Sequence, residues 1–136
     1  MISHPFVHKV GMGLRSAHYP FLEERPETHV AWFEALTENY IDSRGRPWEM
    51  LATVRQDYPV ALHGVGMNIG SIDGVRRDYL EKLKSLIERT EPFIVSDHIC
   101  WTGSPQSNMH DLLPLPYTQE SLNLLSENID EAQSFL

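Results

Sequence analysis

The feature that most constrains the fold of this chain is the alternation of short apolar runs with longer amphipathic segments. Four apolar runs of strand length begin at positions 10, 31, 60 and 93. The runs are Val10–Leu14, Ala31–Leu36, Val60–Val65 and Phe93–Ile99. Strands that alternate with helices are typical of parallel β/α units. We therefore predict an α/β fold with four parallel strands in sequential order and the helices on one side of the sheet.

The apolar spacing between the runs locates the helices. After a short segment around Phe21 and Leu22, helices are expected near Trp48–Tyr58, Val75–Arg89 and Thr118–Leu136. Pro47 suits a first helical turn, and Thr118 suits the N-cap of the last helix. The predicted apolar stripes are Leu80, Leu83, Leu86 and Ile87 in one helix, and Leu122, Leu125, Ile129 and Leu136 in the last. Between the fourth run and the last helix we expect a long loop.

Charge and cysteine content restrict the function classes. Lys and Arg total 11 against 19 Asp and Glu, and the net charge of −8 disfavours a nucleic-acid partner. Cys100 is the single cysteine, so no intrachain disulfide can form, which suits a reducing compartment. The sequence has neither a signal peptide nor an apolar stretch of about 20 residues. We predict a cytoplasmic protein without a membrane partner.

Two histidines have the best placement for metal binding. His63 ends the third apolar run and His98 lies near the end of the fourth, 35 residues later. In parallel β/α folds the active site gathers at the carboxyl ends of the strands. Neutral imidazole is a common ligand of Zn, Fe, Cu and Ni. We predict His63 and His98 as metal ligands, with hydrogen-bonded core histidines as the alternative.

Acidic residues near the same strand ends are candidates to line the site. Alternation along the second run places Trp32, Glu34, Leu36 and Glu38 on one face and Phe33, Ala35 and Thr37 on the other. A carboxylate at Glu34 inside an apolar strand is costly unless it is paired or coordinated, and Arg15 is an alternative partner. Asp97 either lines the site or faces outward and caps a loop.

Two further motifs carry weaker signals. The glycines of GVGMNIG, starting at Gly64, match neither nucleotide-binding fingerprint. The segment HDLLPLP, which begins at His110 and Asp111, holds leucines between prolines. We expect buried leucines and a fixed structure there, with Asp111 either lining the site or capping a turn. Cys100 is interpreted as a packing residue.

Four β/α units are too few to close a barrel, which needs eight strands and typically about 250 residues. The sheet either stays open, pairs with a second half, or continues in a longer chain. The sequence ends at Leu136 in or just after a helix, without a capping glycine. We expect that the chain is part of something longer.

Five ordered blocks resemble one known family. They read GMGLRSAHY, FEALTENY, YPVALHGVGMNIGS, EPFIVSDHICW and HDLLPLPYT, and they extend from about Val10 to the end. This order and spacing resemble the multinuclear non-haem iron-dependent oxidative enzymes, the MbnB- and TglH-like proteins. The resemblance implies a TIM-type (β/α)8 barrel that binds two or three irons at the strand ends.

The resemblance also implies an activity and partners. Such enzymes use dioxygen to modify cysteine residues of ribosomally made precursor peptides in natural product biosynthesis, with a partner protein that captures the peptide leader. The iron-ligating histidines of the HGVG and S-[DE]-H blocks fall on His63 and His98. The site-lining residues carried over from the other blocks are Glu38, Asn39, His110 and Asp111.

The length of the chain departs from the family pattern. Family members run to about twice this length, as a closed barrel requires, and their remaining ligands lie in the other half. We therefore expect residues 1–136 to be the N-terminal half of a single barrel domain, about four β/α units, which binds iron weakly and is inactive alone. Other metal-dependent barrels, such as xylose-isomerase-like and endonuclease-IV-like enzymes, are one alternative. A non-catalytic half-barrel that binds a partner or self-associates through its open edges is another.

Overall fold

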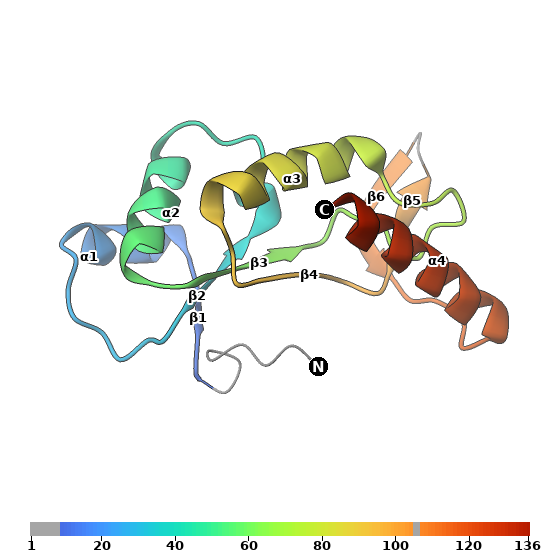
Figure 1. The fold of residues 1–136 in the computed structure, drawn as a ribbon, viewed down its shortest axis with the longest axis horizontal. Coiled ribbons are helices and arrows are strands. Elements are labelled where there is room, and N and C mark those ends of the chain that lie inside the picture. Colours follow the sequence, from blue (N-terminus) through green and yellow to red (C-terminus); the bar gives the residue numbers. More distant parts are fainter. Residues whose placement is uncertain (1–8, 105–106) are drawn as a thin grey trace. The chain divides into compact units, whose positions relative to one another are not determined.

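The computed structural model of the chain describes residues 9–104 and 107–136 (Figure 1). The described residues divide into two compact units. Of the described residues, the first unit comprises 9–63 and Leu86–Ser96, and the second comprises Gly64–Ser85, 97–104 and 107–136. Among the described residues, no helix combines the length and the apolar character that a membrane span requires.

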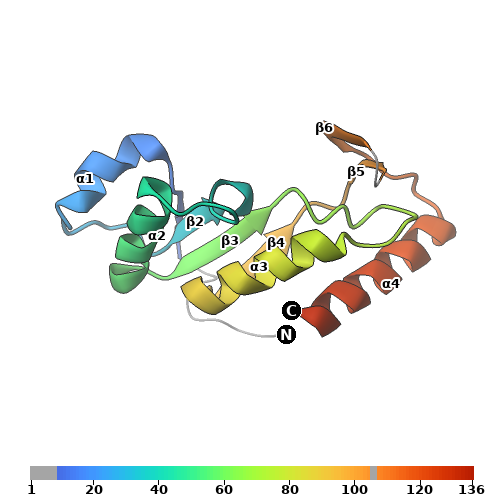
Figure 2. The ribbon, with the colours of Figure 1, turned by 90° about the horizontal axis from the view of Figure 1, so that it is seen from above.

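The four apolar runs form one parallel four-stranded sheet, as predicted. Its strands are β1 (Met12–Gly13), β2 (Phe33–Leu36), β3 (Val60–Gly64) and β4 (Ile94–Asp97). Their order in the sheet is β1-β2-β3-β4, so each strand lies beside its neighbour in sequence, and β2, β3 and β4 can be followed side by side in Figure 2. The sequential order is the arrangement of successive β/α units, although four strands do not by themselves make a barrel.

Alternation along β2 produces two unlike faces, whereas most of β3 is buried on both faces. Phe33, Ala35, Val60 and Leu62 are buried, and so is Thr37 just after β2. The register pairs Phe33 with Val60 and Ala35 with Leu62, so these apolar side chains share one face. The opposite face is half-exposed along β2. Of the two faces that the sequence distinguished, the one with Phe33 and Ala35 is the buried one.

Helices account for the remaining core of the first unit. They are α1 (Tyr19–Glu23), α2 (Arg46–Asp57) and the end of α3 (Arg77–Thr90), with short 3-10 helices at Ser16–His18 and Thr37–Asn39. Pro47 lies in the first turn of α2, as predicted. Leu51 and Val54 are buried, and α1 lies beside α2 in both views (Figures 1 and 2). The Arg89 guanidinium stacks 3.5 Å above the Trp48 ring, which joins α2 to the end of α3.

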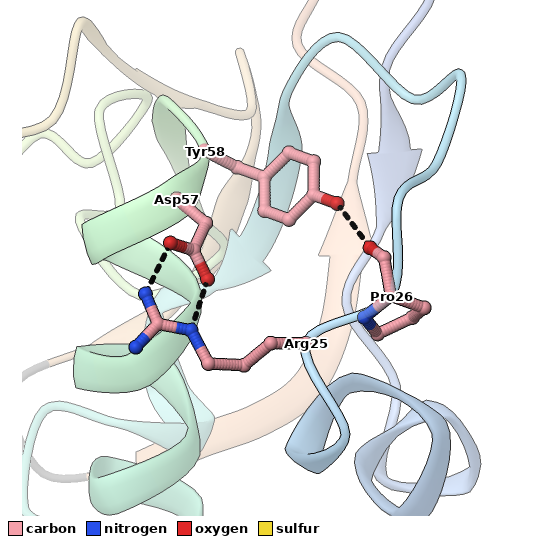
Figure 3. Close-up of polar contacts among 4 residues, drawn as sticks. All are labelled: Arg25, Pro26, Asp57 and Tyr58. Atoms are coloured by element: carbon pink, nitrogen blue, oxygen red, sulfur yellow. Dashed lines mark hydrogen bonds and ion pairs between the residues drawn. The ribbon is translucent and has the colours of Figure 1, made fainter.

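An ion pair fixes the connection between α1 and β2 (Figure 3). Arg25 follows α1 with φ of +50°, a left-handed conformation that disfavours a residue with a side chain. The Arg25 Nε donates to Asp57 Oδ2 at 2.8 Å, and the Arg25 Nη2 donates to Asp57 Oδ1. The Tyr58 hydroxyl donates to the Pro26 carbonyl at 3.2 Å. These bonds hold the loop to the end of α2, near the amino ends of β2 and β3.

The Arg25–Asp57 pair should make stability depend on pH. The hydrogen bond from Arg25 and its positive charge hold the pKa of Asp57 below its ordinary 3.8. A lowered carboxyl pKa stabilises the fold above the unfolded pKa, and this contribution is lost as the pH falls through the folded pKa. We expect Asp57→Asn to lower the urea midpoint near neutral pH, and this difference from the wild-type chain to shrink below pH 3.8.

Glu23→Gln, which removes an exposed ion pair with Arg46 at 2.9 Å, is the control for a surface charge. It should change the urea midpoint less than Asp57→Asn does. An Asp57→Asn difference that is the same at neutral and acidic pH would contradict the assignment to the ionised carboxylate.

The second unit contains an antiparallel hairpin where the sequence predicted a long loop. Its strands are β5 (Trp101–Ser104) and β6 (Ser107–Leu113), paired in a register that joins Trp101 to Leu113 and Ser104 to Ser107. The interpretation of buried leucines is wrong for Leu112, which is 40% exposed. The reason is that this sheet has two strands, so its edges and faces are poorly covered.

The last helix buries a different face from the predicted one. Helix α4 (Gln119–Phe135) begins at the predicted N-cap, where the Thr118 hydroxyl accepts from the Ser121 amide at 3.2 Å. Its buried residues are Asn128 and Ala132, whereas Leu122 is 55% exposed. Asn128 faces inward because its amide donates to two loop carbonyls, at 2.7 and 2.9 Å. In α3 three members of the predicted stripe are buried, namely Leu80, Leu83 and Leu86, whereas Ile87 is half-buried.

Candidate metal centre

His63 lies at the end of β3 on the half-exposed face of the sheet. The β2–β3 register pairs His63 with Leu36 and pairs Ala61 with Glu34. Paired residues of a parallel sheet project to the same face, and so do residues two apart in one strand. The His63 imidazole and the Glu34 carboxylate therefore share the face opposite the apolar core. Both residues are half-buried rather than enclosed.

Ser96 of β4 orients the His63 ring. The Ser96 hydroxyl donates to the Leu62 carbonyl at 3.5 Å and lies 2.9 Å from His63 Nδ1. The Ser96 contact restrains the direction of the His63 ring, and an imidazole binds a metal through a ring nitrogen that carries no proton. Ser96 is not among the residues predicted from the sequence, although it lies directly before Asp97 and His98.

Glu38 and Asn39 lie after β2, whereas the sequence pattern counted Glu38 as part of that strand. β2 ends at Leu36, and residues Thr37–Asn39 form a 3-10 helix. Strand alternation therefore does not extend to Glu38, which is half-buried, and Asn39 is exposed. The turn places both residues at the carboxyl end of β2, the end at which β/α enzymes hold their chemistry.

His98 directly follows β4 and is half-buried in the second unit. Its backbone N–H donates to Asp97 Oδ1 at 2.7 Å, and the Met67 N–H donates to Asp97 Oδ2 at 3.2 Å. Asp97 therefore caps the loop after β3, which is one of its two predicted roles. It is half-buried rather than turned outward.

The glycine-rich loop after β3 packs against the hairpin. Asn68, at φ of +59°, donates from Nδ2 to the Gly103 carbonyl at 3.0 Å and accepts from the Thr102 N–H at 2.7 Å. Gly70 donates its N–H to the Cys100 carbonyl at 2.8 Å. A Cβ at Gly70 would lie 2.7 Å from that same carbonyl oxygen. Close backbone packing therefore accounts for glycine at position 70, without a bound phosphate.

The remaining candidates lie in or near the hairpin. His110 and Asp111 are both in β6, and Asp111 is exposed and accepts from the Leu112 N–H at 2.8 Å, a local backbone cap. Cys100 is buried, and burial, together with the nearby Asp97 charge, raises the pKa of its thiol. A raised thiol pKa disfavours the reactive thiolate, in agreement with a packing role.

The described residues supply donors of the type that iron binds, but not a complete set. Imidazole and carboxylate are ligands for non-haem iron, and His63 and Glu34 share one face of the sheet. The side chain of His110 lies outside the described part of the structure. Among the side chains that are described, no three from His, Cys, Asp or Glu gather as a metal site requires. His63 belongs to the first unit and His98 to the second. Their binding of a common metal stays a prediction.

Comparison with known proteins identifies the family. Residues 9–136 match the model described as "RiPP precursor modification enzyme MbnB/TglH/ChrH", where RiPP denotes a ribosomally synthesised and post-translationally modified peptide. The chain belongs to this family. The family is the one that the five sequence blocks resemble, so that prediction is confirmed.

Several curated relatives of this chain are named as UPF0276 proteins. A UPF0276 protein of Caulobacter vibrioides is 48% identical over 126 residues, which cover 93% of this chain and 45% of the relative. A UPF0276 protein of Rhizorhabdus wittichii is 48% identical over 127 residues, covering 93% and 46%. One from Vibrio parahaemolyticus is 40% identical over 134 residues, covering 98% and 45%. The chain thus spans about half the length of the curated relatives it matches.

Proposed function

We propose that this chain contributes part of the iron centre of an enzyme that oxidatively modifies cysteine residues in a ribosomally made precursor peptide. His63 and His98 are the iron ligands, and Glu34, Glu38, Asn39, Asp97, His110 and Asp111 line the site or support it. The observation that carries the proposal is the family match over residues 9–136, since it includes every one of these positions. Bound iron would supply the binding and activation of dioxygen.

The geometry around His63 supports its role. The Ser96 hydroxyl lies 2.9 Å from His63 Nδ1, so it restrains the orientation of the ring before a metal binds. Glu34 is on the same face of the sheet, where a carboxylate beside apolar residues is expensive unless it meets a cation. The two residues together offer one nitrogen and one carboxylate from adjacent strands. The other ligands of a complete centre would come from His98 and from the part of the relatives that this chain does not span.

The family description supports a precursor peptide as the substrate, and we propose the partner protein in addition. A precursor peptide is the substrate, and a leader-binding partner protein presents it to the iron. A peptide thiolate can enter the coordination sphere only if the protein ligands leave positions open, as catalytic metal sites do. A donor set built from a few side chains on strand ends, with a half-exposed face between them, is consistent with such an open site.

A chimaera tests this function in the context of a complete chain. In it, the present chain replaces the 126 matching residues of the Caulobacter relative. The chimaera and the unaltered relative are incubated with ferrous iron, air and a library of short cysteine-containing peptides. We expect mass spectrometry to find, for both proteins, a mass change located on a cysteine residue that requires iron and dioxygen.

The control reactions omit iron, replace air by argon, or replace the cysteine of the peptide by serine. None should yield the product. A chimaera that binds iron but leaves every such peptide unchanged, while the relative modifies one, would refute the proposal for this chain. Cleavage of abasic-site DNA or isomerisation of a sugar by the iron-loaded chimaera would favour the other metal-dependent barrels.

A further inference from the structure

The carboxylate of Asp97 joins two backbone segments within the second unit. Its Oδ1 accepts from the N–H of His98 at 2.7 Å, and its Oδ2 accepts from the N–H of Met67 at 3.2 Å. Met67 belongs to the loop that follows β3, and His98 directly follows β4. One side chain therefore ties together the segments that leave two adjacent strands.

The carboxylate lies in a niche that the sequence keeps open. A Cβ at Gly64 would lie 2.5 Å from Asp97 Oδ2 and 2.6 Å from the Tyr79 hydroxyl oxygen. Real Cβ atoms do not approach other atoms so closely, so any side chain at position 64 would displace one of these groups. Tyr79, in α3, is only 7% exposed. The glycine, the tyrosine and the aspartate thus form one packed group, which we call the Asp97 niche (Gly64, Tyr79 and Asp97).

We propose that Asp97 is a positioning residue for His98, rather than a metal ligand. Both of its oxygens accept backbone N–H groups, and one of these belongs to His98 itself. Fixing that N–H sets the backbone at His98 and hence the direction in which the imidazole leaves it. The inference rests on the proposed function, because it takes His98 to be an iron ligand.

The two bonds require a carboxylate. Ionised aspartate offers only acceptors, so it can serve two N–H groups at once. Asparagine has the same shape but replaces one oxygen by an NH2 group, which would face a backbone N–H. Glutamate keeps both acceptors on a longer side chain. Asp97→Asn should therefore break one bond, whereas Asp97→Glu should restore much of the arrangement.

Amide hydrogen exchange on the metal-free chain tests the backbone contacts. We expect Asp97→Asn to accelerate exchange at Met67 or His98 by at least about tenfold, since local opening governs exchange. Asp97→Glu should exchange more slowly than Asp97→Asn. Gly64→Ala, which displaces the carboxylate without removing it, should accelerate exchange at the same two amides. The control is Asp130→Asn, which removes an exposed carboxylate of α4 and should leave both rates unchanged.

A cobalt(II) titration tests the consequence for the imidazole. Cobalt(II) is an air-stable substitute for ferrous iron that broadens the NMR signals of a ligating ring. The concentration that half-broadens the His98 ring signals should rise about 10–100-fold in Asp97→Asn, the usual effect of losing a group that orients a ligand. It should return toward the wild-type value in Asp97→Glu. A merely structural role would not produce this rescue.

The outcomes separate the two hypotheses. Wild-type cobalt affinity in Asp97→Asn, with or without faster exchange, would overturn the positioning role. If His98→Ala binds cobalt as the wild-type chain does, the proposed ligand role of His98 fails instead. In that case faster exchange in Asp97→Asn would show only that the carboxylate holds the backbone, and the inference about the imidazole would fall with the ligand assignment.

Discussion

Replacing His63 or His98 by alanine in the chimaera should remove most of the bound iron and lower the rate of peptide modification by at least about 100-fold. The estimate is a lower bound, because losing even a residue that orients a metal ligand costs about 10–100-fold. Elemental analysis and mass spectrometry of the peptide measure the two effects. Each substitution should act alone, since a centre that has lost one protein ligand no longer holds its metal in the required geometry.

The matched control for these substitutions is His29→Ala. His29 is exposed and lines a hollow of about 510 Å³ beside Arg25 and Asp57, near the amino ends of the strands. The His29→Ala chimaera should therefore keep its iron and its activity. Ser96→Ala should have an intermediate effect, because it leaves the His63 ring in place but removes the group 2.9 Å from Nδ1. Full activity in His63→Ala would mean that this histidine is an ordinary residue of the sheet.

Gly70→Ala should destabilise the second unit. The new Cβ would lie 2.7 Å from the Cys100 carbonyl oxygen and 2.7 Å from a methyl carbon of Leu115. The carbonyl cannot move aside without breaking its hydrogen bond from the Gly70 N–H. Overpacking of this kind costs about 1–3 kcal/mol. Urea unfolding should show a lower midpoint for Gly70→Ala than for the wild-type chain.

Gly45→Ala provides the comparison for Gly70→Ala. No atom lies within 4 Å of the Cβ that it would introduce, and Gly45 is exposed before α2. Gly45 is the N-cap of α2, where alanine is a poorer residue than glycine, so some loss is expected, but it should be smaller than that of Gly70→Ala. If the two variants unfold at the same urea concentration, close packing does not explain glycine at position 70. That result would favour a ligand-binding role for the glycine-rich loop after β3.

Much of the secondary structure could be predicted because its signals are local. The four apolar runs contain all four strands of the parallel sheet, and Thr118 caps α4 at the predicted residue. Burial on one face of a strand or helix imposes a period on the sequence, and that period survives without knowledge of the neighbours. The family could likewise be recognised from ordered sequence blocks. The same blocks indicated His63 and His98, whose role as ligands remains a prediction.

The tertiary structure decided the features that depend on residues far apart in the chain. Segment Trp101–Leu113 forms a hairpin in a structure where Asn68, more than thirty residues earlier, bonds to both Thr102 and Gly103. Asn128 turns inward because the carbonyls of Ile69 and Ser71 need a donor. Asp97 looked like either a site-lining residue or a cap, and only its bonds to the Met67 and His98 amides distinguish the two. A polar side chain has no period of its own, so its role is set by the partner that folding brings within reach.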